Sequence, residues 1–245
     1  LLTVPVTAKC PDDLTQLKDG SCVVILGGAD GLCNALEECA LLSQTKQQDY
    51  FLIGFHQRHV TYEGPKFTWS YMWTSIADIL QNRNQDRNGW RDANPRNPEH
   101  FSQEGEIVWD ENQPMGSEHA TAVIYSTHLL HDVPLKNFNA QVVCELIGPT
   151  TSAPTSLVQL KENFPVVLTT FYNDDPGADG CYVQSAEVNL GKCAFRCAMN
   201  KDCRSLYYHQ SNGTCVQMLY IDARLPFEYR NYVRQWKRYA KTGYT

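Results

Sequence analysis

Apolar side chains recur along the first half of the chain with both helical and strand spacing. Residues 32–42 carry apolar positions at intervals of three and four, which predicts a helix with one buried face. The apolar positions of this helix are Leu32, Ala35, Leu36 and Cys39. Short apolar runs at 50–55, 120–125 and 141–145 predict buried strands. The turn signal Asp19-Gly20 predicts a hairpin within residues 10–22.

The second half of the chain shows the same two patterns around four cysteines. Cys193 and Cys197 are four residues apart, which places both on one face of a helix. Cys203 follows a short polar break, and the aromatic run 206–208 after it predicts a strand. Two helical cysteines beside two cysteines on flanking strands can link a helix to a sheet by disulfides. Alternation within 232–236 predicts the last strand.

Residues 148–156 separate the two halves. They are rich in Pro, Thr and Ser and have no charge or apolar periodicity, which predicts an extended, exposed linker. The predicted organisation is therefore a domain at 1–147, the linker at 148–156 and a domain at 157–245. The linker hydroxyls are either O-glycosylation sites or part of a plain flexible connection; they belong to Thr150, Thr151, Ser152, Thr155 and Ser156.

The cysteine content indicates the cellular compartment in which the protein folds. The 245 residues include ten cysteines, an even number at wide and irregular spacing that predicts disulfides in a secreted protein. Five cysteines fall in each half, so at least one bond must cross between domains or between molecules if all are paired. The sequon at Asn212 is a candidate N-glycosylation site. Because the sequence starts at Leu1 rather than Met, we expect a mature product whose signal segment is absent.

Charge and motifs exclude several classes of function. The net charge of −6 argues against nucleic acid as the main partner, and no apolar run is long enough to span a bilayer. The close histidine pairs His56/His59 and His128/His131 lack the third ligand that zinc needs, so no metal site is predicted. No nucleophile elbow, phosphate loop or zinc-protease motif is present. We therefore expect a protein that is not an enzyme.

The motifs of the first half resemble those of C-type lectin-like domains over roughly residues 10–146. The hairpin resembles that of the family's long form, and residues 52–55 resemble its Trp-Ile-Gly-Leu core strand. Trp109 and Gln113-Pro114 match a loop whose proline is usually cis, and residues 143–145 match the closing strand. The second half resembles a PAN/apple domain over roughly 165–240. The resemblance implies an α+β fold: a C-type lectin-like domain followed by a small disulfide-linked module with a helix packed on an antiparallel sheet.

The resemblance also implies a set of disulfides. The family pairs are Cys10–Cys22, Cys39–Cys144, Cys193–Cys215 and Cys197–Cys203. Cys33 and Cys181 are left over, and we predict that they join the two domains. The alternative is that each pairs with another molecule, which would give a disulfide-linked polymer. The family's inner disulfide is missing, because its cysteines align with Ala120 and Leu135.

The family's sugar-binding calcium site is only partly present. Gln113, Glu118 and Asp132 align with ligand positions, whereas Met115 and His131 replace oxygen ligands. Ca²⁺ takes six to eight oxygens, so three oxygen donors make a poor cage. We therefore expect no cofactor, with a residual calcium site as the alternative.

Two further segments are candidates for binding. The polar insertion at 81–99 contains Trp90, Arg87, Arg91 and Arg96. These residues either form a stacking and anion-binding patch or belong to a solvated loop whose Trp90 packs into the core. The basic and aromatic tail at 224–241 either binds an acidic or sulfated polysaccharide or forms a solvated strand face.

These observations predict a secreted, non-catalytic recognition or adhesion protein that binds carbohydrates or extracellular proteins, mostly without calcium. The candidate surface is the 81–99 loop together with residues 113–118. The alternative is a self-associating component of an extracellular coat, matrix or filament. That alternative rests on the long polar loop, the odd number of cysteines in each half and the aromatic tail.

Overall fold

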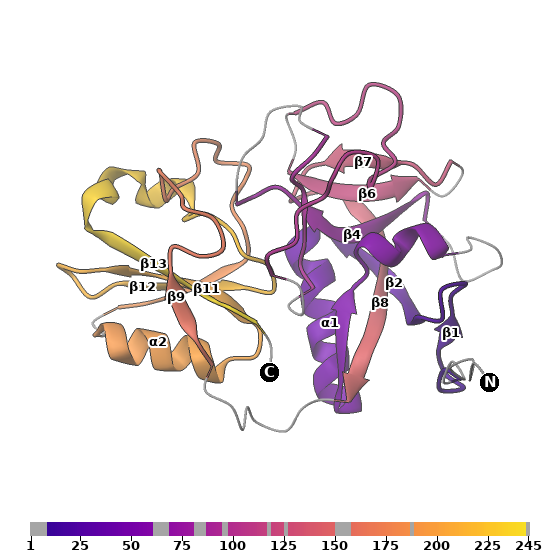
Figure 1. Ribbon diagram of the computed structural model, residues 1–245, viewed down its shortest axis with the longest axis horizontal. Helices are drawn as coiled ribbons and strands as arrows, with labels where there is room; N and C mark the ends of the chain where they lie inside the picture. The colour runs from indigo at the N-terminus through magenta and orange to yellow at the C-terminus, as the bar shows by residue number, and fades with distance from the viewer. Residues whose placement is uncertain are drawn as a thin grey trace, which may run out of the picture.

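In the computed structural model, the described residues are 9–60, 69–80, 87–94, 98–116, 119–124, 127–149, 158–186 and 189–243. They form two α+β domains that lie side by side, each with a helix packed on a largely antiparallel sheet (Figure 1). The predicted linker glycosylation sites Thr150, Thr151 and Thr155 lie outside the described residues, and so does Glu118. No helix within the described ranges is long and apolar enough to cross a membrane.

The first domain is built around an eight-stranded sheet in which β8 is central. Its order is β1-β2-β8-β4-β6-β7, with β3 also paired to β8 and β5 to β4. The strands are β1 (Thr15–Gln16), β2 (Cys22–Asp30), β3 (Gln48–Leu52), β4 (Tyr71–Ala77), β5 (Arg91–Asp92), β6 (Ala120–Ile124), β7 (Leu130–Val133) and β8 (Asn139–Pro149). The predicted strand at 50–55 ends at Leu52, because the chain turns into the short 3-10 helix η1 (Phe55–His59).

The helix α1 (Leu32–Lys46) buries the predicted apolar stripe. It starts after Gly31, whose φ of +98° favours glycine and where a Cβ atom would lie 2.9 Å from the carbonyl oxygen of Leu135. It ends at Lys46, four residues beyond the predicted end, and the C-cap residue Gln47 is in the left-handed conformation. Ala120 and Leu135 are both buried in the core, at the positions where the family has its inner disulfide.

The second domain has a five-stranded sheet of order β10-β12-β11-β13-β9. Its strands are β9 (Leu160–Glu162), β10 (Tyr182–Ser185), β11 (Cys203–His209), β12 (Cys215–Leu219) and β13 (Trp236–Lys241). The helix α2 (Leu190–Met199) packs on β11, and the side chain of Asn189 caps it by accepting from the backbone N–H of Lys192. The predicted strand at 232–236 is wrong: η2 (Phe227–Gln235) is a 3-10 helix, and the strand begins at Trp236.

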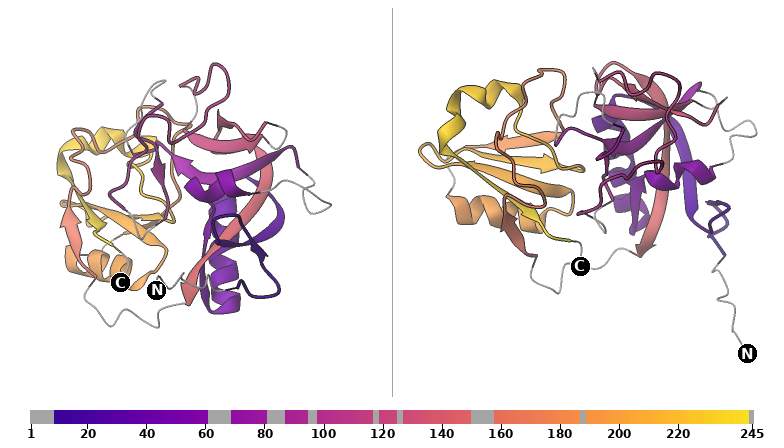
Figure 2. Two further views of the ribbon diagram at one scale, coloured as in Figure 1. Left: turned by 45° about the vertical axis from the view of Figure 1, so that its right-hand side comes forward. Right: turned by 45° about the horizontal axis from the view of Figure 1, so that its top comes forward.

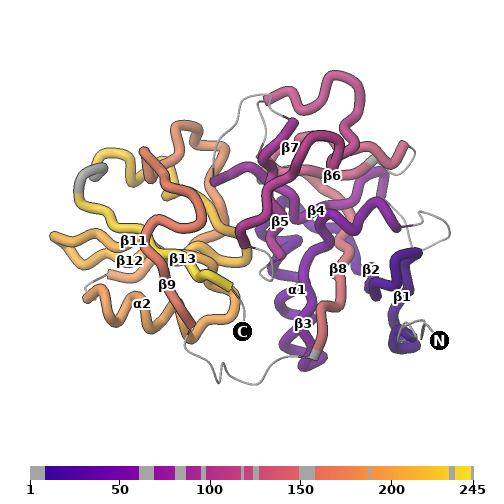
Figure 3. Tube along the Cα trace, viewed as in Figure 1, coloured from indigo at the N-terminus to yellow at the C-terminus, as the bar shows by residue number. Residues whose placement is uncertain are grey.

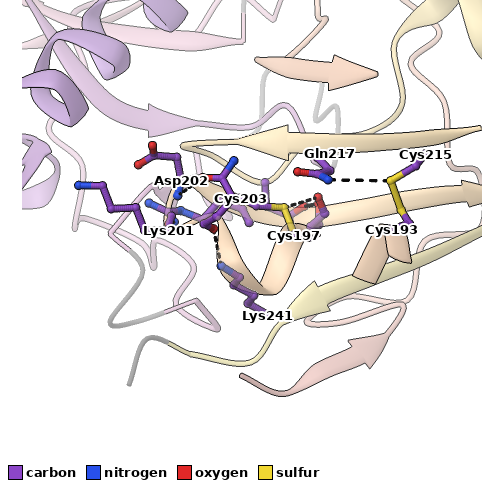
Figure 4. The surroundings of a disulfide bond; sticks show 12 residues. Cys193, Cys197, Lys201, Asp202, Cys203, Cys215, Gln217 and Lys241 are labelled. Atoms are coloured by element: carbon purple, nitrogen blue, oxygen red, sulfur yellow. Dashed lines mark hydrogen bonds between the residues drawn. A yellow bond between two sulfur atoms is a disulfide. The ribbon is translucent and has the colours of Figure 1, made fainter. Parts of the chain in front are cut away.

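The ten cysteines form five disulfides, and none is free. Within the domains the pairs are Cys10–Cys22, Cys39–Cys144, Cys193–Cys215 and Cys197–Cys203. Figure 4 shows the last two linking α2 to the sheet of the second domain. Cys33 of α1 bonds to Cys181 just before β10, so this pair joins the domains within one chain rather than two molecules.

The two domains also share one hydrophobic core. Leu36 and Ile79 from the first domain belong to the same cluster of buried side chains as Tyr207, Met218 and Ile221 from the second. The further views and the tube trace show the same side-by-side arrangement (Figures 2 and 3). The junction is therefore an apolar interface closed by a covalent bond.

Candidate functional site

Gln113 and Asp132 lie together, but they bond to backbone groups. The backbone N–H of Asp132 donates to Oε1 of Gln113 at 3.1 Å, and the N–H of Gly116 donates to Oδ2 of Asp132 at 3.0 Å. Both side chains are buried, and the Gln113–Pro114 peptide bond is cis, as the resemblance implies. The pair therefore closes the 113–116 turn against β7.

This arrangement does not favour calcium. Oδ1 of Asp132 is the one buried oxygen here without a hydrogen-bond partner among the described residues, far fewer than the six to eight that Ca²⁺ takes. His131, which stands where the family has an asparagine, lies 2.6 Å from Oδ2 of Asp110 through its Nε2. That hydrogen bond lowers the pKa of the Asp110 carboxyl. No cluster of three His, Cys, Asp or Glu side chains that could hold a metal ion occurs within the described ranges.

The predicted patch of Trp90, Arg87 and Arg91 does not form. The Trp90 side chain is 1% exposed and its ring centre lies 4.9 Å from that of Trp109, so Trp90 belongs to the core. Its backbone N–H donates to Oγ of Ser102, which holds this end of the loop against the domain. The alternative interpretation, a core tryptophan, is therefore the correct one.

Arg87 and Arg91 lie in different parts of the molecule. Arg87 is exposed, and its Nε donates to the carbonyl oxygen of Gln113 at 3.0 Å. Arg91 is buried at the junction between the domains, where its Nη1 lies 3.5 Å from Oδ2 of Asp222. Arg87 therefore remains on the outer surface, whereas Arg91 is part of the domain interface.

A cavity of about 240 Å³ lies beside η1 in the first domain, and we call it the η1 cavity. It opens between the end of β3, η1, β8 and the residues Asn94, His100 and Glu106. Its walls carry aromatic, imidazole and carboxylate groups together. The side chains used below are Phe55, His56, Asp92, His100, Glu106 and Glu145.

Two carboxylate–imidazole pairs line this cavity. Nδ1 of His56 lies 2.7 Å from Oε1 of Glu145, and Nε2 of His100 lies 2.9 Å from Oε1 of Glu106. The ring of His100 meets the ring of Phe55 edge to face at 5.2 Å between centres, which brings the two pairs to one site. The hydrogen bond that His56 donates to Glu145 raises the pKa of His56 despite its partial burial.

Asp92 holds the cavity wall in place. Its Oδ2 accepts from the N–H of Phe55 at 3.1 Å, and its Oδ1 accepts from Ser75 Oγ at 2.6 Å and from the N–H of Asn94 at 2.9 Å. Gly54 permits this approach, because a Cβ atom there would overlap the Asp92 carboxylate. The start of η1 is thereby tied to β4 and β5, and the cavity is largely preformed.

The chemistry of the η1 cavity fits a small ligand with several hydroxyl groups. Carboxylates accept hydrogen bonds from pairs of hydroxyls, and an aromatic ring packs against the C–H face of a sugar ring. The volume lies just below the roughly 300–1,000 Å³ of pockets that enclose drug-sized ligands, so it suits a single ring.

Sequence reasoning did not identify the η1 cavity. Among its polar side chains, only His56 stands out in the sequence, as half of the histidine pair His56/His59. Two signals were available: Phe55 and His56 follow Gly54 at the end of a buried strand, and Glu145 directly follows the closing Cys144. Because Phe51 pairs with Glu145 in the sheet, these groups meet at one strand end.

The fold is α+β in both domains, and the second domain holds two disulfides of its own. Residues 177–229 match the model of the PAN domain family. They run from before β10 into η2 and include α2 with its two disulfides.

Several solved structures, two of them of C-type lectin domains, are similar to a little over half of the chain. The C-type lectin CEL-I from Cucumaria echinata is 17% identical, covers 57% of this chain and 98% of its own, and has a TM-score of 0.40. The C-type carbohydrate-recognition domain of cow CD23 is 16% identical over 56% of this chain and 95% of its own, at a TM-score of 0.39. A Ca²⁺-dependent type II antifreeze protein is 15% identical over 56% and 98%, at 0.36. No curated protein matches the chain.

Proposed function

We propose that this protein is a secreted, non-catalytic recognition protein that binds carbohydrate in the η1 cavity without calcium. The observation that carries the proposal is the meeting of two carboxylate–imidazole pairs and Phe55 around one cavity of about 240 Å³. The oxygens at the family's calcium position are instead engaged in closing a turn. We therefore assign sugar binding to the η1 cavity rather than to the turn at 113–116.

Secretion is part of the same proposal. Five disulfides fit an oxidising compartment, and Asn212 is exposed in the turn between β11 and β12, where a glycan has room. The linker threonines Thr150, Thr151 and Thr155 are proposed O-glycosylation sites. A mass map of the protein isolated from its native medium would test each site.

The test is a glycan array on the purified protein, in calcium and again in a chelator. We expect binding that survives chelation and is lost in Glu145→Gln and Glu106→Gln, because an amide cannot accept with both atoms. Glu111→Gln, an exposed position outside the cavity, is the matched control and should bind as the wild type does. Binding that disappears on chelation, or that both cavity variants retain, would contradict the proposal.

A second candidate function is contact with a protein, including a second copy of this chain. Phe195 and Met199 lie one helical turn apart on α2, and their side chains are 65% and 58% exposed. Exposed large apolar side chains that adjoin one another often mark an interaction surface. We expect any association seen by light scattering to weaken in Phe195→Ser/Met199→Ser. An unchanged mass distribution in that variant would exclude α2 as the contact.

A further inference from the structure

A second, smaller cavity lies at the junction between the domains. Its volume is about 40 Å³, and we call it the junction cavity. The first domain contributes Arg91 and Asp92 of β5 to its lining, and the second domain contributes Arg204, Asp222 and Lys241. The two halves of the chain therefore have to be docked for this cavity to exist.

The carboxylates of the junction cavity are held by neighbouring donors. Asp222 is shared between two arginines: its Oδ2 lies 2.5 Å from Nη2 of Arg238 and 3.5 Å from Nη1 of Arg91. Its Oδ1 accepts from Ser205 Oγ at 2.6 Å. Asp92, the other lining carboxylate, accepts from neutral donors of its own domain.

Basic side chains of both domains meet at this cavity. Among the described residues, the basic side chains around it are Arg91, Arg204, Arg238 and Lys241, and the carboxylates are Asp92, Asp222 and the neighbouring Asp202. Burying a charge is costly unless an opposite charge or hydrogen-bonding group compensates it. Several buried basic groups around one small cavity favour a bound anion.

Arg91 and Lys241 are both buried beside the cavity. The Arg91 side chain is 9% exposed, and its buried Nε has no hydrogen-bond acceptor among the described residues. Its Nη2 donates to the carbonyl oxygen of Pro98, and its guanidinium lies over the ring of Phe101. Lys241 donates to the carbonyl oxygen of Asn200 at 2.8 Å (Figure 4). Burial, followed by the charge of Arg204, lowers the pKa of Lys241 to about 7.

We propose that the junction cavity binds a small oxyanion group, a sulfate or carboxylate, between Arg91, Arg204 and Lys241. The volume has room for about three water-sized groups, which suits one such group and excludes a sugar ring. A guanidinium donates charge-assisted hydrogen bonds to an oxyanion, and the Nε of Arg91 supplies a donor that is not otherwise used. Because both domains contribute cations, the anion also strengthens their docking.

The test is thermal unfolding of the full chain against inorganic sulfate, with ionic strength held constant by sodium chloride. A bound anion raises the melting temperature with a saturable dependence on its concentration. Sulfate also stabilises proteins in general, but that effect rises steadily and is shared by all variants. The saturable component is therefore the diagnostic measurement.

The wild type and three variants are compared. We expect the saturable component in the wild type and in Arg196→Gln, which removes an exposed arginine of α2, and its loss in Lys241→Met. Lys241→Met removes a buried charge and should fold, whereas Arg91→Gln disturbs the ion pair with Asp222 and serves as a second variant. A steady rise of equal slope in the wild type, Arg196→Gln and Lys241→Met would overturn the proposal.

The source of the anion is then separated by a second titration. A sulfated monosaccharide that acts at a lower concentration than inorganic sulfate identifies the group as part of a larger acidic ligand. A monosaccharide that has no effect where sulfate acts identifies the site as one for the free anion. The neutral parent sugar is the control, and a saturable shift from it would contradict recognition of the oxyanion.

Discussion

Removing the Cys33–Cys181 disulfide tests whether the two domains fold as one unit. The two cysteines are 148 residues apart in sequence. The Cys39–Cys144 bond already closes most of that loop, so the shortest path runs from Cys33 to Cys39 and from Cys144 to Cys181, about 43 residues. The chain-entropy relation gives about 4 kcal/mol for this path, against about 5 kcal/mol for the full loop.

The perturbation is the double variant Cys33→Ser/Cys181→Ser, with the other four bonds intact. The assay is equilibrium unfolding in guanidinium chloride, followed by tryptophan fluorescence and by circular dichroism. We expect a loss of about 4 kcal/mol in the free energy of unfolding. A single transition should remain, because the shared core that includes Leu36 and Tyr207 still joins the domains.

The matched control is Cys10→Ser/Cys22→Ser. This bond closes 12 residues within the first domain, and the same relation gives about 3 kcal/mol for it. A loss below about 1 kcal/mol in Cys33→Ser/Cys181→Ser would refute the reasoning, because the unfolded chain would then gain little freedom. Two separate transitions in the wild type would refute it as well, since the domains would then unfold independently.

Three further predictions concern charge and metal. His119 lies between Asp78 and Asp175. Burial lowers the pKa of His119, but the two carboxylates together raise it by more, so the pKa lies above its usual value. The stability that His119 contributes is present below pH 6.5 and is lost as the pH rises through its folded-state pKa. In urea unfolding, His119→Gln should therefore show a smaller fall in the free energy of unfolding over this pH range. A pH profile identical to that of the wild type would contradict the prediction. Because the pKa of Lys241 is lowered, the unfolded chain binds more protons than the folded one between about pH 7 and 10. Lys241→Met should therefore stabilise the protein by a few kcal/mol at pH 6 and by progressively less toward pH 10. A stabilisation that grows with pH would contradict this prediction. A calcium chelator should leave the melting temperature unchanged in calorimetry, because Gln113 and Asp132 bond to backbone groups; a drop of several degrees would restore a calcium site.

Local patterns predicted the elements whose partners are close in sequence or whose face is set by periodicity. The stripe from Leu32 to Cys39 is buried because three- and four-residue spacing fixes one face of a helix. The same spacing places Cys193 and Cys197 toward the sheet, where both are fully buried. The end of the chain was harder, because alternation at 232–236 resembles a strand although the segment is part of a 3-10 helix.

The candidate site was less predictable, because its residues meet only through the fold. The polar character of 81–99 suggested an exposed loop, yet Trp90 is held in the core through Ser102 and Trp109, which lie outside that segment. The η1 cavity brings His56 next to Glu145, which is 89 residues away. Composition within a window carries no information about such a pair, since either residue alone is ordinary at a surface.

The junction between the domains was equally hard to predict from local sequence patterns, with one exception, the cysteine count. Arg91, Asp222 and Arg238 are unremarkable charges in the sequence, and the basic tail was interpreted as a surface strand or a polysaccharide site. In the structure Arg238 is fully buried against Asp222, because the tail strand β13 lies inside the second sheet and faces the first domain's Arg91 across Asp222. Parity of the cysteines was the one signal that reached this far: if all ten are paired, five on each side of the linker require at least one bond between the domains or between molecules. A count can constrain a long-range contact where a pattern cannot, because pairing applies to the whole chain whereas periodicity applies to a window.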